Sequence, residues 1–190
     1  MARDFGRNFI NIVGNEKVRR IVALGNLLLR DYGFDRLHAV SDLFFGISPD
    51  REYCCRDLTG TDFIEYAYGE WGDDDQWCFK SSTRIPDRFE NHIVTTLAKV
   101  DSNVYLRNLY DSELGTFIGV RYKGVKDNRL VQVLRHQPIY EQVVFDGYKK
   151  FDDQITWAEL WDRQSKLDLD AQREFEAIMG VRNPPEIFFE

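Results

Sequence analysis

The chain has 190 residues, of which 43% are hydrophobic and 14% aromatic, and it carries a formal net charge of -7. This length and apolar fraction suit one ordinary domain with an appendage, and they exclude a mostly disordered chain. No run reaches the roughly 18 apolar residues of a membrane-spanning helix. The first residues contain no apolar signal core, so we expect a cytoplasmic protein of the host cell with no membrane partner.

The amino-terminal part predicts a strand followed by a helix. Residues 8–14 alternate apolar and polar side chains and end on a glycine, which is typical of a strand. Asn15 suits the N-cap of a helix with a broad apolar face, and Gly33 is its expected end. Residues 34–61 have no sustained period, so they are interpreted as a long connection with one short element.

The central stretch, residues 63–122, organises the rest of the predicted domain. It combines β-rich runs, an acidic turn and one amphipathic helix that Pro86 opens. The expected elements are a strand at 63–68, the turn at 70–75, a strand at 76–80, a helix from 86 to about 99, and a hairpin of strands 104–110 and 116–122. Residues 130–134 predict a further strand, and Pro138 after it indicates a sheet edge.

Residues 151–190 are predicted to form an acidic helical C-terminal arm. They contain four Lys or Arg and ten Asp or Glu, a net charge of -6, whereas residues 120–150 contain seven basic and three acidic residues. Thr156 and Glu159 form the pattern of a capping box at the start of one helix. A second helix is expected from about residue 170 to 179, where Gly180 stops it.

The order of these elements predicts an α+β fold. We expect a mainly antiparallel sheet with helices on one face in residues 1–150, followed by the helical arm in residues 151–190. The face opposite the helices is expected to be open or to be covered by the C-terminal helices.

Several of these features resemble the YubB-type ferredoxin-like domain of plasmid and bacteriophage proteins. They are the first strand ending in glycine, the Trp71-Gly72 turn, the Trp77 strand, the Pro86 helix and the hairpin between residues 115 and 124. The likeness covers about residues 9–124, and it departs from the family in the acidic residues between Gly72 and Trp77. The resemblance implies a ferredoxin-like fold and a phage or plasmid setting, and it implies no catalytic residues.

The sequence does not predict an enzyme, a cofactor or a metal site. Its three histidines are far apart, and no Gly-rich loop carries the lysine that a phosphate loop needs. The odd count of cysteines, Cys54, Cys55 and Cys78, favours reduced thiols over a disulfide framework. The alternative is a metal-dependent hydrolase at the acidic turn, where these carboxylates could gather around Mg²⁺: Asp62, Glu70, Asp73, Asp74 and Asp75.

The preferred hypothesis is a non-catalytic accessory protein that binds a host protein or a nucleoprotein complex through its arm. Aromatic side chains rimmed by charge make good binding hot spots. The candidate partner-binding residues are Trp157, Trp161, Glu159, Asp162, Ile187, Phe188 and Phe189. A role in host takeover or anti-defence follows from the resemblance alone. Self-association of the basic patch with the acidic arm is a further expectation, and the simplest competing interpretation is that the arm covers its own sheet.

The alternative function is binding of RNA or single-stranded DNA through the sheet. Ferredoxin-like sheets can present aromatic side chains to stacked bases, beside cations that contact phosphates. The candidate residues are Arg107, Phe117, Arg121, Lys123, Lys126 and Arg129. The overall acidity of the chain counts against a dominant phosphate-binding role.

Overall fold

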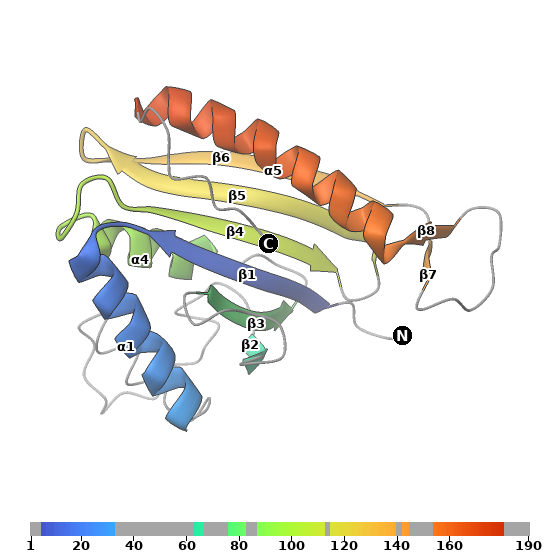
Figure 1. Ribbon diagram of the computed structural model, residues 1–190, viewed down its shortest axis with the longest axis horizontal. Coiled ribbons are helices and arrows are strands. Elements are labelled where there is room, and N and C mark those ends of the chain that lie inside the picture. The colour runs from blue at the N-terminus through green and yellow to red at the C-terminus, as the bar shows by residue number, and fades with distance from the viewer. Residues whose placement is uncertain are drawn as a thin grey trace.

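A computed structural model describes residues 5–32, 63–66, 76–82, 87–112, 115–139, 142–144 and 154–180 (Figure 1). Within these ranges the fold is α+β, as the sequence predicts. The helices are α1 (Glu16–Tyr32), α4 (Asp87–Leu97) and α5 (Trp157–Met179). The strands are β1 (Phe5–Val13), β2 (Phe63–Tyr66), β3 (Gln76–Ser82), β4 (Tyr105–Ser112), β5 (Phe117–Lys126), β6 (Arg129–Pro138), β7 (Gln142–Val144) and β8 (Gln154–Thr156).

The described strands form one large sheet and one small one. The large sheet has the order β2-β3-β1-β4-β5-β6, and every neighbouring pair in it is antiparallel. Strands β7 and β8 pair in parallel as a separate small sheet. In the part of the chain that is described, β6 is therefore an outer strand of the large sheet, as Pro138 indicates from the sequence.

Helices lie on both faces of the large sheet. Helices α1 and α4 pack their apolar residues, including Val18 and Ile93, against Ile10 of β1 and Leu106 of β4. Helix α5 crosses the opposite face over β5 and β6 (Figure 1), where Ala171 and Phe175 join a second cluster with Val120, Tyr122 and Val133. The sheet is therefore the middle layer of three, because alternate residues of its strands belong to different cores.

The C-terminal arm differs from the expectation in its number of helices, and it takes one of the two placements that the sequence left open. Residues 157–179 form one continuous helix, so the prediction of a separate second helix from about residue 170 is wrong. Residues 165–169 contain neither glycine nor proline, so nothing in the backbone interrupts the helix there. The arm also does not stand apart from the sheet, since Leu160, Ala171 and Phe175 of α5 are buried. It supplies the helical layer of the second face.

The hairpin between β5 and β6 has a tight two-residue turn. Asp127 and Asn128 have positive φ values of 50° and 59°, the backbone conformation of a type I′ turn. Lys126 and Arg129 pair on either side of it.

No helix in the described ranges is long and apolar enough to cross a membrane. The expected long connection at 34–61 and the acidic turn at 70–75 lie outside the described residues.

Candidate protein-binding surface at the amino end of helix α5

Helix α5 begins and ends at the residues that the sequence predicts. Thr156 accepts a hydrogen bond from the Glu159 backbone at 3.2 Å, and the Glu159 carboxylate accepts one from the Thr156 backbone at 2.8 Å. Hydrogen bonds from the Thr156 backbone and hydroxyl lower the pKa of Glu159 below its ordinary value. Gly180 ends the helix in the left-handed conformation with φ 75°. The capping box therefore fixes the first turn of α5.

A buried glutamine and an apolar stripe join α5 to the sheet. The Gln164 amide donates hydrogen bonds to the backbone carbonyls of Tyr110 at 3.1 Å and Gly119 at 3.3 Å. Because Gln164 is buried, these bonds satisfy a side chain that would otherwise lose hydration without compensation. The contact also fixes the position of α5 along β4 and β5.

Acidic side chains of α5 pair with basic side chains of the sheet. Asp168 receives two hydrogen bonds from the Arg107 guanidinium, one of them at 3.0 Å, and a third from the Tyr122 hydroxyl at 2.8 Å. Burial, and then the charge of Asp168, raises the pKa of Tyr122 well above its ordinary value. Burial alone would lower the pKa of Arg107, but its hydrogen bond and charge interaction with Asp168 raise it.

Two further contacts lie closer to the carboxyl end of α5. Arg135 of β6 donates to Asp170 at 2.8 Å and also pairs with Glu174. Lys126 of β5 donates to the carbonyl of Ile178 at 2.5 Å, in the last turn of the helix. These contacts match the competing interpretation in which the acidic arm lies on the basic residues of its own chain.

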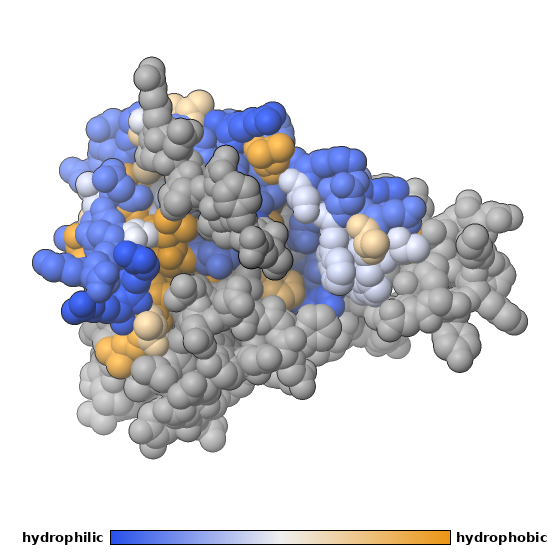
Figure 2. All heavy atoms as spheres, in the orientation of Figure 1, coloured by the Kyte–Doolittle hydropathy of each residue, from blue (hydrophilic) through white to orange (hydrophobic). Residues whose placement is uncertain are grey.

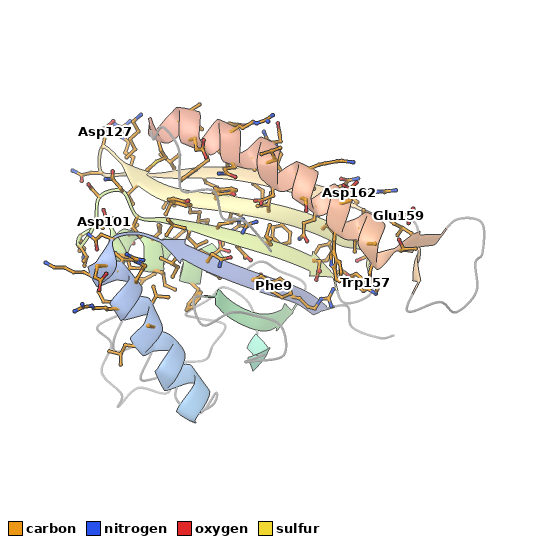
Figure 3. All side chains as sticks on the ribbon, in the orientation of Figure 1. Phe9, Asp101, Asp127, Trp157, Glu159 and Asp162 are labelled. Atoms are coloured by element: carbon orange, nitrogen blue, oxygen red, sulfur yellow. The ribbon has the colours of Figure 1, made fainter. Side chains whose placement is uncertain are left out.

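The tryptophan surface, which we define as Trp157, Glu159, Trp161 and Asp162, lies at the amino end of α5. The indole rings of Trp157 and Trp161 have centroids 6.4 Å apart. The Arg7 guanidinium lies 4.7 Å from the centroid of the Trp157 ring, in the geometry of a cation–π contact. Figure 3 shows Trp157, Glu159 and Asp162 together at this end of the helix.

Arg7 itself is held in place by the neighbouring strand. Its guanidinium donates two hydrogen bonds to Asp111 of β4, at 2.6 and 2.8 Å. A bidentate pair of this kind restricts the arginine to one orientation. The Trp157 ring is therefore supported by a rigid part of the sheet, and Trp157 in turn supports Trp161.

Among the described residues, Trp161 is the most exposed large hydrophobic side chain. It keeps 56% of its surface accessible, although it is the largest hydrophobic side chain that α5 exposes. Glu159 and Asp162 are also exposed, and Asp162 accepts a hydrogen bond from Lys166 at 2.6 Å. Figure 2 shows the outer side of α5 as mainly hydrophilic, with a paler patch at its amino end. An exposed indole with a charged rim results.

The residues of the nucleic-acid alternative do not share one surface. Arg121 and Lys123 are buried under α4, on the face of the sheet opposite to Arg107. Phe117 packs on Tyr110 and His136, with centroids 6.3 and 5.5 Å away. The two remaining cations, Lys126 and Arg129, are exposed.

A buried charged cluster holds the two basic residues under α4. Lys123 donates to Asp87 at 2.6 Å and to Asn91 at 2.5 Å. Arg121 donates to the same Asp87 carboxylate at 2.6 Å and to Glu90 at 2.8 Å. Burial alone would raise the pKa of Asp87, but the hydrogen bond and charge of Lys123, with the charge of Arg121, lower it.

The sequence did not predict the ion pairs that these residues form. Arg7, Asp87, Glu90, Asp111 and Asp168 each pair with a residue in another element. No local motif predicts such pairs. The only signal is the position of Arg121 and Lys123 on one side of a strongly apolar strand, where an unpaired charge would be costly.

The carboxylates of the acidic turn, Cys54, Cys55 and the tail residues Ile187, Phe188 and Phe189 lie outside the described residues. Within the described ranges, no group of three His, Cys, Asp or Glu side chains is placed to hold a metal ion.

Comparison with known proteins does not assign this chain to a family. No protein-family model, no curated protein and no solved structure matches it. The resemblance to the YubB-type domain therefore stays a prediction.

Proposed function

We propose that this protein acts without catalysis, by binding another protein through the tryptophan surface. The observation that carries the proposal is the exposed indole of Trp161, which stands on the supported ring of Trp157. Tryptophan and arginine are enriched among binding hot spots. A side chain that is already positioned loses less conformational freedom on binding, so more of its contact energy contributes to affinity.

The same proposal includes a ferredoxin-like arrangement for residues 5–112. It is supported by the element order β1-α1-β2-β3-α4-β4, by the antiparallel strand order β2-β3-β1-β4, and by helices α1 and α4 on one face. The partner is proposed to be a host protein or a nucleoprotein complex. That identity and the phage or plasmid setting rest only on the resemblance described above.

The test compares two variants of exposed residues on the same helix. Trp161→Ala removes the indole, whereas Leu169→Ala removes an apolar side chain of similar exposure outside the tryptophan surface. Captured partners are identified from a bacterial lysate, and their affinity for each purified variant is then measured by calorimetry. A hot-spot residue contributes at least about 2 kcal/mol, so Trp161→Ala should weaken binding roughly 30-fold. Leu169→Ala should bind like the natural chain.

The result that rejects this surface is equal affinity of Trp161→Ala and the natural chain for the captured partner. Circular dichroism of both variants is the control for folding. Because Trp161 is mostly exposed, its removal should leave the fold intact.

Nucleic-acid binding has less support from the described residues. Arg107, Arg121 and Lys123 are buried in ion pairs, and the sheet separates the first from the other two. Binding of a single-stranded oligonucleotide at low salt, weakened by Arg129→Glu, would favour this alternative. Such binding should fall steeply as the salt concentration rises.

A further inference from the structure

Strand β6 forms a long, regular outer edge of the large sheet. Its register with β5 runs without a shift from Lys126–Arg129 to Phe117–Pro138. At the opposite edge, β2 is short and its pairing with β3 is irregular between Phe63 and Glu65. A long regular edge with free backbone groups is a template for pairing with another strand.

The direction of the free backbone groups follows from the turn. In a two-residue type I′ hairpin the flanking residues, Lys126 and Arg129 here, exchange both of their backbone hydrogen bonds. The bond from the Ile139 N–H to the Thr116 carbonyl, at 2.7 Å, continues the same alternation. The N–H and C=O groups of Leu130, Gln132 and Leu134 therefore point away from β5. Pro138 falls on the same outward side, where its missing N–H removes no bond to β5.

The side chains of these outward residues are also exposed. Leu130 and Leu134 keep 40% and 39% of their surfaces accessible, and Gln132 and His136 are exposed beside them. All four lie on the face of the sheet that α4 covers elsewhere, because Leu134 and Gln132 are register partners of Arg121 and Lys123. One outward group, the Leu134 carbonyl, accepts a hydrogen bond from the exposed Arg135 guanidinium at 3.3 Å. The edge thus combines outward backbone groups, which no other described strand pairs, with two exposed leucines.

On the other face of β6, one group of side chains carries excess negative charge, and a separate arginine carries positive charge. Arg135 pairs with both Asp170 and Glu174, so this group carries one excess negative charge. Arg129 is exposed and forms no ion pair with the described residues. Residues 129 and 135 are placed symmetrically about Gln132.

We propose that two copies of this chain pair through β6, antiparallel, with Gln132 on the two-fold axis. Leu130 then stands opposite the partner subunit's Leu134, and both exposed leucines of each copy become covered. Arg129 then stands opposite the partner subunit's Arg135, and the two carboxylates of the partner subunit's Asp170 and Glu174 balance the charges of both arginines. The two large sheets become one continuous sheet, and the two α5 helices lie side by side on the same face because α5 covers β5 and β6.

The first test is site-directed disulfide formation. Gln132→Cys places two cysteines directly opposite each other in a hydrogen-bonded antiparallel pair, with Cα atoms about 5.5 Å apart, which suits a disulfide. Leu130→Cys is the matched control. In the proposed dimer residue 130 stands opposite residue 134 of the other copy, so the two copies of residue 130 are too far apart for a disulfide. Both variants carry Ser in place of Cys54, Cys55 and Cys78. We expect a 132–132 cross-linked peptide for Gln132→Cys, at a rate at least tenfold above that of Leu130→Cys.

The second test is the oligomeric state of the full chain, measured by sedimentation equilibrium. The natural chain should be a dimer at micromolar concentration, and Leu134→Lys should raise its dissociation constant at least tenfold. Arg129→Glu should also weaken the dimer, and the salt dependence of dissociation should decrease in that variant. Trp161→Ala should leave the dimer unchanged, which separates this inference from the proposed partner surface. A natural chain that is monomeric at 100-fold higher concentration, or equal cross-linking of the two cysteine variants, would overturn the proposal.

Discussion

At the scale of single residues, the buried charged cluster under α4 dominates the chemistry of the interior. Lys123 and Glu90 have no exposed side-chain surface, and their charged groups lie 3.2 Å apart. Charges in such a place are tolerated only when each is paired and hydrogen-bonded. The Asn108 amide joins the cluster by donating to Glu90 at 2.6 Å. Two atoms of the cluster, Arg121 Nε and Asn108 Oδ1, are nevertheless buried without a hydrogen-bond partner, so the cluster is not fully satisfied.

Removal of one partner from this cluster should be strongly destabilising. Lys123→Met keeps much of the side-chain volume but leaves Asp87 and Glu90 without their ammonium partner. We expect the free energy of unfolding to fall by about 3–5 kcal/mol in urea denaturation. Lys99→Met, at an exposed position, is the control and should change it by less than about 0.5 kcal/mol. Similar losses in both variants would contradict the assignment of a paired, buried Lys123.

The same cluster predicts a dependence of stability on acidic pH. The pKa of Asp87 is lower in the folded chain than its ordinary value of 3.8, so the unfolded chain binds this proton more tightly. The contribution of Asp87 to stability is therefore present above about pH 3.8 and is lost as the pH falls through the lower folded pKa.

Asp87→Asn should lose this dependence. We expect the variant to be less stable than the natural chain at pH 7, with a difference that narrows as the pH approaches 3. Urea denaturation between pH 3 and pH 7 measures the effect, and Asp127→Asn in the exposed turn is the control. If the difference in the free energy of unfolding between Asp87→Asn and the natural chain does not change with pH, the charge of Asp87 does not contribute to stability.

At the scale of elements, the capping box makes α5 a well-defined structural unit. Thr156 and Glu159 each satisfy a backbone N–H of the other residue, and such groups have no partner within the helix itself. The tryptophan surface begins at Trp157, the residue after Thr156, so its geometry depends on the first turn of α5.

Thr156→Ala should therefore destabilise the protein and loosen the tryptophan surface. Loss of an N-cap hydroxyl costs about 1 kcal/mol, which urea denaturation resolves. The near-ultraviolet circular dichroism of the Trp157–Trp161 pair should weaken at the same time. Ser165→Ala, in the middle of the same helix, should retain both properties. An unchanged signal and stability in Thr156→Ala would contradict the role of the cap.

At the scale of the whole molecule, α5 completes the second core instead of extending from a finished domain. Val120, Tyr122 and Val133 are buried together with Ala171 and Phe175 of α5. The expected boundary between residues 1–150 and 151–190 stays a prediction, since burial in one chain does not measure whether either part folds alone.

A truncated chain of residues 1–150 tests that boundary. Without α5, the apolar residues of the second core become exposed to water. We therefore expect the truncated chain to lose its cooperative urea transition and to aggregate. A soluble fragment with a sharp transition and natural near-ultraviolet dichroism would instead establish residues 1–150 as an independent domain.

The sequence by itself determined most of the elements, because their signals are local. Alternation indicated β1 and β5, and a β-rich run indicated β4. Pro138 indicated the edge position of β6, and the Thr156–Glu159 pattern and Gly180 indicated both ends of α5. The prediction of two C-terminal helices was wrong, because residues 165–169 contain no glycine or proline that would end a helix.

Only the tertiary structure decided what the charged residues do. Arg107 and Asp168 are 61 positions apart, and Arg7 and Asp111 are 104 apart, so no spacing in the sequence joins them. Because alternate residues of a strand face opposite sides of the sheet, Arg107 and Arg121 became parts of different buried networks, although both read as surface cations. The exposure of Trp161, Leu130 and Leu134 was decided in the same way, by which faces the helices left uncovered.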